Sequence, residues 1–150
     1  MIPSSVEKEI VIEAPVDVVW HLLTEPGEMR QWLAAETELD LRDGGAGAIT
    51  FESGNSFQLQ VEAVEPPHRF AFRWVRSPGL TLRDDNTLLV EFFLEPQKGG
   101  TRLRVVESGF DAIDWSDEEQ ARTAENHSDG WERCLARLRG LAANSAGAGE

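Results

Sequence analysis

The spacing of apolar and polar positions changes several times along this chain, and each change predicts a different element. Residues 5–13, SVEKEIVIE, alternate apolar and charged side chains, which predicts a strand with one solvent-facing side. Residues 14–24, APVDVVWHLLT, place apolar side chains at steps of three and four, and Pro15 suits the first turn of a helix. Residues 25–34 break at a Pro-Gly pair and resume as a second short helix.

Between residues 36 and 108 the alternation returns, and the connecting segments are rich in glycine, proline and polar residues, which is typical of antiparallel hairpins. The predicted strands cover 36–41, 46–52, 56–65, 69–76, 86–96 and 101–108. The connection 77–86, SPGLTLRDDN, is longer than a tight turn needs, and we expect it to form a mobile lip over a site. From about residue 117 to 143 helical spacing resumes and predicts one long amphipathic helix.

A strand, two short helices, six more strands and a long final helix predict an α+β fold. The seven antiparallel strands would form a curved sheet around the C-terminal helix, with a cavity between them. We expect a single domain over residues 1–144 and a disordered tail over 145–150, SAGAGE, because the tail has nothing to bury.

Strand alternation predicts which side chains face the cavity. The inward set is Phe57, Leu59, Val61, Ala63, Phe70, Phe72, Trp74, Leu103, Val105 and Glu107. Glu107 is thus a carboxylate on an apolar face, although it lies near a strand end, just before Gly109, and could instead reach solvent.

His127 and Trp131 lie four residues apart in the last helix and share one face of it. His127 is either a core histidine bonded to a nearby carbonyl or carboxylate, or a ligand contact, and Glu107 could be its partner. Gly130 costs about 1 kcal/mol relative to alanine inside a helix. We expect it to remove a side chain where the helix passes close to its neighbours, so that Gly130→Leu disturbs docking; the alternative is a simple kink.

Composition and charge argue against some classes of binding partner. The chain has 27 acidic and 14 basic residues, and its net charge of −13 argues against nucleic acid and anionic membrane surfaces. Neither a signal sequence nor a long apolar run is evident, so we expect a cytoplasmic protein without an integral membrane segment. The single cysteine, Cys134, is interpreted as a structural thiol, and the sequence predicts no metal site, no cofactor and no serine nucleophile.

Four segments carry a resemblance to a known family: VIEAPVDVVWHLLTEPGEMRQWL, VEAVEPPHRFAFRW, TRLRVVESGF and NHSDGWERCLARL. In this order they resemble the bacterial family named for its similarity to the C-terminal domain of the activator of heat-shock protein 90 ATPase. That family belongs to the START-like, or SRPBCC, superfamily of helix-grip folds. The resemblance implies a ligand-binding module, and it turns the face of His127 and Trp131 toward the cavity.

Three functions follow as hypotheses. The leading one is binding of a small apolar or aromatic molecule, with no catalytic residue assigned. The predicted ligand-binding residues are Trp32, Phe57, Leu59, Phe72, Trp74, Glu107, His127 and Trp131. The alternatives are a polyketide cyclase- or dehydratase-like enzyme using Glu107 and His127, and a co-chaperone that stimulates the heat-shock protein 90 ATPase. Exposed strand edges and the apolar residues of 77–86 leave a homodimer open.

Overall fold

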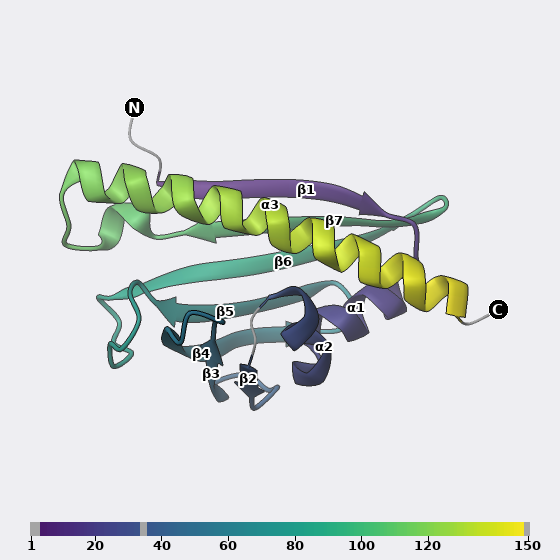
Figure 1. Ribbon diagram of the computed structural model, residues 1–150, viewed down its shortest axis with the longest axis horizontal. Helices are drawn as coiled ribbons and strands as arrows, with labels where there is room; N and C mark the ends of the chain where they lie inside the picture. The colour runs from purple at the N-terminus through teal and green to yellow at the C-terminus, as the bar shows by residue number, and fades with distance from the viewer. Residues whose placement is uncertain (1–3, 34–35, 149–150) are drawn as a thin grey trace.

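The computed structural model describes residues 4–33 and 36–148, with side chains described as far as residue 143 (Figure 1). Its elements follow the predicted order. They are β1 (Ser5–Ile12), α1 (Val16–Thr24), α2 (Pro26–Trp32), β2 (Glu36–Leu39), β3 (Ala46–Thr50), β4 (Ser56–Glu65), β5 (Arg69–Val75), β6 (Thr87–Gln97), β7 (Gly100–Ser108), a short 3-10 helix η1 (Phe110–Ala112) and α3 (Asp117–Ala148).

The seven strands form one antiparallel sheet in the order β1-β7-β6-β5-β4-β3-β2. Consecutive strands from β2 to β7 are neighbours, whereas β1 pairs with β7, so that Val6 lies opposite Glu107. Figure 1 shows α3 lying along one face of the sheet, with α1 and α2 beneath its C-terminal half. This α+β arrangement, a curved sheet gripping a long helix, confirms the predicted fold class.

Local sequence explains where the helices begin. Pro26 occupies the first turn of α2, where a missing N–H costs nothing, so this proline starts the helix and does not only interrupt it. The Ser116 hydroxyl accepts a hydrogen bond from the Glu119 N–H at 3.0 Å and caps α3. The last helix continues to Ala148, so residues 145–148 of the predicted disordered tail are helical, and residues 149–150 lie outside the described residues.

A β-bulge changes one of the predicted inward positions. The register of β4 against β5 shifts between Val61 and Ala63, because one extra residue enters β4 there. Val61 lies opposite Phe72, but beyond the bulge Val64 lies opposite Phe70 and Ala63 opposite Ala71. Val64, and not Ala63, therefore packs against the core, and the inward prediction for Ala63 is wrong.

Aromatic rings fill the space between the sheet and the first two helices. Phe70 and Phe92 stack with centroids 6.0 Å apart, and Trp32 meets Phe92 edge to face, also at 6.0 Å. The Trp32 indole N–H donates to the Leu22 carbonyl at 2.7 Å, so its one polar atom is satisfied inside the core. Because each fully buried ring contributes roughly 1.5–3 kcal/mol, this ring cluster is a main source of stability.

The connection 77–86 is hydrogen-bonded to β4. The Gly79 N–H donates to the Ser56 carbonyl at 3.0 Å, and the Leu82 N–H donates to the Gln58 side-chain carbonyl at 2.9 Å. The buried Asn86 amide donates to the Thr81 carbonyl and closes the loop on itself. Residues of this loop line a hollow of about 450 Å³ beside Arg76 and Ile113. That hollow is separate from the space under α3, so the loop forms no lip over that space.

Candidate functional site

Glu107 is fully buried, with 0% of its surface exposed, on the face of β7 that α3 covers. Its neighbours across the sheet are Val6 on β1 and Val90 on β6. The strand alternation predicted this inward direction, and the alternative that the side chain reaches solvent is wrong. A carboxylate in apolar surroundings is costly unless hydrogen-bond donors replace the lost water.

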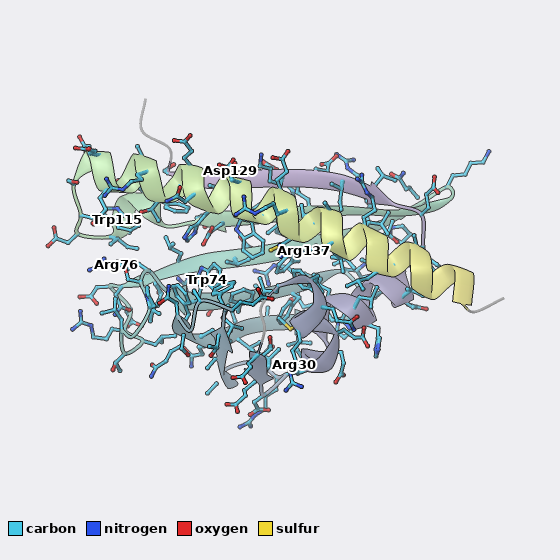
Figure 2. All side chains as sticks on the ribbon, in the orientation of Figure 1. Arg30, Trp74, Arg76, Trp115, Asp129 and Arg137 are labelled. Carbon is cyan, nitrogen blue, oxygen red and sulfur yellow. The ribbon has the colours of Figure 1, made fainter. Side chains whose placement is uncertain are left out.

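Three side chains supply hydrogen bonds to this carboxylate. The Trp74 indole N–H donates to Oε2 at 2.8 Å, and the Trp131 indole N–H donates to Oε1 at 2.9 Å. His127 Nδ1 lies 2.8 Å from the same Oε1. Trp74 comes from β5, in the sheet below α3 (Figure 2), whereas Trp131 and His127 come from one face of α3. The carboxylate thus joins the sheet to the closing helix.

The hydrogen bonds also decide which polar atoms remain available. Both indole N–H groups are used by Glu107, so the two tryptophans present only apolar ring surface to their other neighbours. A carboxylate oxygen accepts hydrogen bonds, so a proton on Nδ1 of His127 can be donated to Oε1 of Glu107. Nε2 of His127 makes no hydrogen bond to a described residue, and 23% of the side chain is exposed.

A hollow of about 130 Å³ lies against this cluster, and we call it the inner hollow. It is lined by Leu33, Phe51, Phe57, Trp74, Asn126, His127, Gly130, Trp131 and Cys134. The rings form a connected wall, because Phe57 lies 5.7 Å from Trp74 and Trp74 lies 5.8 Å from Trp131, centroid to centroid. The space is smaller than the few hundred Å³ typical of ligand pockets, since aromatic rings fill the rest of the interior.

Gly130 lies at the wall of the inner hollow, and its role differs from the prediction. A Cβ atom built at this position would meet no atom within 4 Å outside its own helix neighbourhood. The helix therefore does not pass close to another element at Gly130, and the expected close approach is wrong. The effect of Gly130→Leu on docking stays a prediction. The missing side chain leaves open space that belongs to the hollow.

The predicted ligand-binding residues separate into three groups. Phe57, Trp74, His127 and Trp131 line the inner hollow, and Glu107 lies behind them. Trp32 lines an adjoining hollow of about 430 Å³, which we call the outer hollow, together with Arg30, Gln31, Leu33, Phe51, Glu52, Ser53 and Arg137. Phe72 and Leu59 line neither hollow, because Phe72 is enclosed by the rings of Phe70, Trp74 and Phe92.

Sequence reasoning missed four residues of the inner hollow: Leu33, Phe51, Asn126 and Cys134. Leu33 and Phe51 directly follow α2 and β3, where periodicity no longer predicts direction. Cys134 lies one helical turn after Trp131 on the same face, and that spacing could have indicated it. Burial raises the pKa of the Cys134 thiol, although the charges of Arg137 and Arg133 partly oppose this, so the neutral form is favoured.

Within residues 4–33 and 36–148, no group of three or more histidine, cysteine, aspartate or glutamate side chains is arranged to hold a metal ion. Within the same residues, no helix combines the length and the apolar character needed to cross a membrane. The site therefore consists of rings, one buried carboxylate, one imidazole and one thiol.

Comparisons with known proteins give the same fold. The model of the family described as Activator of Hsp90 ATPase homolog 1-like protein matches residues 13–143. Protein MLL2253 from Mesorhizobium loti is 28% identical with a TM-score of 0.79, and the match covers 93% of this chain and 97% of that one. CalU16 from Micromonospora echinospora is 26% identical with a TM-score of 0.67, covering 89% and 73%.

A further structural neighbour is DynU16, a protein of the dynemicin biosynthetic locus. It is 25% identical with a TM-score of 0.73, and the match covers 91% of this chain but only 46% of DynU16. No curated protein sequence matches this one significantly.

Proposed function

Because this chain belongs to the Activator of Hsp90 ATPase homolog 1-like family, we propose that it binds a small apolar or aromatic molecule between the sheet and α3. The family match covers the strands and the helix that build the inner hollow. A cytoplasmic location is part of the same proposal. DynU16, a protein of the dynemicin biosynthetic locus, is related in fold.

The observation that carries the proposal is the way Glu107 uses both indole N–H groups. Without this carboxylate, the indole N–H groups of Trp74 and Trp131 would need water or another polar group as hydrogen-bond acceptor. With their donors bound to a buried carboxylate, their ring surfaces line the inner hollow beside Phe57. A hollow of this kind favours a flat apolar group, and His127 Nε2 adds one polar contact for orientation.

Binding can be measured by the intrinsic fluorescence of tryptophan, because Trp74 and Trp131 line the hollow. The probes are 4-phenylbutan-1-ol and decan-1-ol, one aromatic and one aliphatic. We expect saturable binding of at least one probe and a rise in melting temperature that grows with its concentration. Absence of both effects for both probes would contradict the proposal.

A matched pair of variants localises the binding. Gly130→Leu places a side chain in the inner hollow, whereas Gly140→Leu places the same side chain at an exposed position of α3 with equal free space. We expect Gly130→Leu to weaken probe binding at least tenfold and Gly140→Leu to leave it unchanged. Equal behaviour of the two variants would place the bound probe elsewhere.

A second candidate function is acid–base catalysis, favoured by the 2.8 Å contact between Glu107 and His127 beside a hollow. The buried carboxylate cannot reach a substrate, because Trp74, Trp131 and His127 surround it. Glu107 would therefore position the imidazole, and Nε2 of His127 would accept the proton. A base placed in this way at a hollow meets the geometric condition for general-base catalysis, which a cyclase- or dehydratase-like reaction would use.

The catalytic candidate is tested with 5-nitrobenzisoxazole, an aromatic probe whose ring opens when a base removes its carbon-bound proton. Loss of that proton breaks the N–O bond and gives a coloured cyanophenolate. A functional base should accelerate the reaction by about 10²-fold or more over the His127→Gln variant. If the two proteins give equal rates, His127 is no base for this reaction, and the binding function stands alone.

A further inference from the structure

The outer hollow adjoins the inner one, and the two share Leu33 and Phe51 in their walls. Their linings differ in character. Rings dominate the inner hollow, whereas Arg30, Gln31, Ser53 and Arg137 give the outer hollow several hydrogen-bond donors, beside the carboxylate of Glu52. A molecule that fills both would meet an apolar surface at one end and a polar one at the other.

Two arginines from different helices line this outer hollow. Arg30 lies in the last turn of α2 and Arg137 lies on α3 above it in Figure 2. Neither makes an ion pair or hydrogen bond with any residue in the described part of the chain. On the sheet, by contrast, Arg69, Arg102 and Arg104 each pair with a glutamate.

The absence of an acidic partner is notable in a chain whose net charge is −13. The other arginines of α3, Arg122, Arg133 and Arg139, also make no ion pair with a described residue, but they line neither hollow, so position and not pairing distinguishes Arg137. Glu52 lines the outer hollow, yet neither guanidinium lies within 4.0 Å of its carboxylate. Among the residues that line the hollow, two arginines face this single carboxylate; a second one, that of Glu28, lies beside the lining residue Gln31 at 3.1 Å.

Guanidinium groups bind carboxylates through two parallel N–H···O hydrogen bonds, and this geometry suits a planar anion. The Ser53 hydroxyl can add a neutral donor at the same place, whereas the Gln31 amide already donates one hydrogen bond to Glu28 Oε2 at 3.1 Å. The inner hollow has no cation comparable to these, because its only basic group is the imidazole that Glu107 already holds.

We propose that the natural ligand is an amphipathic carboxylic acid, bound as its anion across both hollows. Its apolar or aromatic body occupies the inner hollow, and its carboxylate lies between Arg30 and Arg137 in the outer hollow. Leu33 and Phe51 support the junction. This inference rests on the proposed binding function and adds the chemical class of the ligand to it.

The test compares acids with the alcohols of the same skeleton: 4-phenylbutanoate with 4-phenylbutan-1-ol, and decanoate with decan-1-ol. Dissociation constants are measured by calorimetry or tryptophan fluorescence at pH 7.5 for the wild type and for Arg30→Gln/Arg137→Gln. We expect at least one acid to bind the wild type about tenfold more tightly than its alcohol. The double variant should lose this advantage and keep the affinity for the alcohol within twofold.

Two further variants make the result specific. Arg139→Gln removes the same charge from α3 outside both hollows and should leave the affinity for the acid unchanged. Glu52→Gln removes the competing carboxylate and should strengthen the binding of the acid, an effect that misfolding cannot produce.

Each contrary outcome has a separate meaning. If the alcohols bind the wild type as tightly as the acids, the carboxylate inference is overturned while the binding function stands. If Arg139→Gln weakens the acid as much as the double variant, the effect is one of overall charge, and the inference is again overturned. If no probe binds at all, the inference falls together with the proposed function.

Discussion

Near α1 and α2 the sheet is covered by rings that pack directly on one another, whereas under the middle of α3 rings surround a carboxylate and leave a hollow. Phe70, Phe72 and Phe92 represent the first region, with centroid separations of 5.8 to 6.3 Å. Trp74 and Trp131 represent the second, at a similar separation of 5.8 Å. Similar ring spacing therefore accompanies a solid interior in one place and an open one in the other.

Two features of the second region account for the difference. Glu107 binds the polar edges of both tryptophans, so the indoles are fixed by hydrogen bonds in addition to ring packing. Gly130 then leaves space on α3 where a larger residue would extend toward the rings. In this protein the hollow in the aromatic interior coincides with both a polar anchor for its walls and a position without a side chain.

The largest effect is expected in the solid region. Phe70→Ala removes a fully buried ring that contacts Trp20, Phe72 and Phe92, and it should lower the free energy of unfolding by about 3–5 kcal/mol. Urea denaturation followed by circular dichroism measures the loss. Phe93→Ala, on the other face of the sheet, should cost clearly less because that ring is only half-buried. Equal losses would show that the ring cluster is not the principal core.

The second largest effect on stability is expected when Glu107 is replaced. Glu107→Leu leaves two indole N–H groups and one imidazole without their acceptor, and each unsatisfied buried donor costs about 1–3 kcal/mol. We expect the free energy of unfolding to fall by about 3 kcal/mol, and the emission of Trp74 and Trp131 to change. Glu107→Gln keeps one acceptor oxygen and should lose less. A Glu107→Leu protein as stable as the wild type would contradict the anchoring role.

A smaller effect is expected from Trp131→Phe, which keeps a ring but removes one donor to Glu107. The loss should be about 1–2 kcal/mol, since the carboxylate keeps its other two partners. In a Glu107→Leu background the same substitution should cost clearly less, because the indole N–H there has no acceptor left. Additive losses across this double-mutant cycle would show that the two side chains act independently.

The smallest effect, and the only stabilising one, concerns Gly130. Gly130→Ala should raise the free energy of unfolding by up to about 1 kcal/mol, because alanine is the better helix former and the added Cβ meets open space. Gly140→Ala provides the matched control on the same helix, also with nothing within 4 Å. We expect both variants to be stabilised to a similar extent, and only Gly130→Ala to bind the probes more weakly. That result would show that the glycine at position 130 keeps the hollow open at the expense of helix stability.

The order of the elements could be predicted from the sequence because periodicity is a local property. Alternation in β7 indicated an inward Glu107, but its place near the strand end left the solvent-facing alternative open until the structure excluded it. Helical spacing was sufficient to place His127 and Trp131 on one face of α3. The bulge in β4 was not predictable in this way. Because of the bulge, Val64 lies on the inner face of the sheet in place of Ala63. The bulge depends on the pairing of β4 with β5, and the sequence of β4 alone does not show that pairing.

The same distinction between local pattern and tertiary packing applies to the candidate site. The sequence by itself determined the α+β fold and the aromatic character of the inner face, because residue type and spacing indicate which face a side chain takes. Only the tertiary structure decided that Gly130 borders open space, that Leu33 and Phe51 connect two hollows, and that Arg30 and Arg137 meet at one of them. These depend on how elements distant in the chain pack, and free space between them is a property of the packing and not of any single segment.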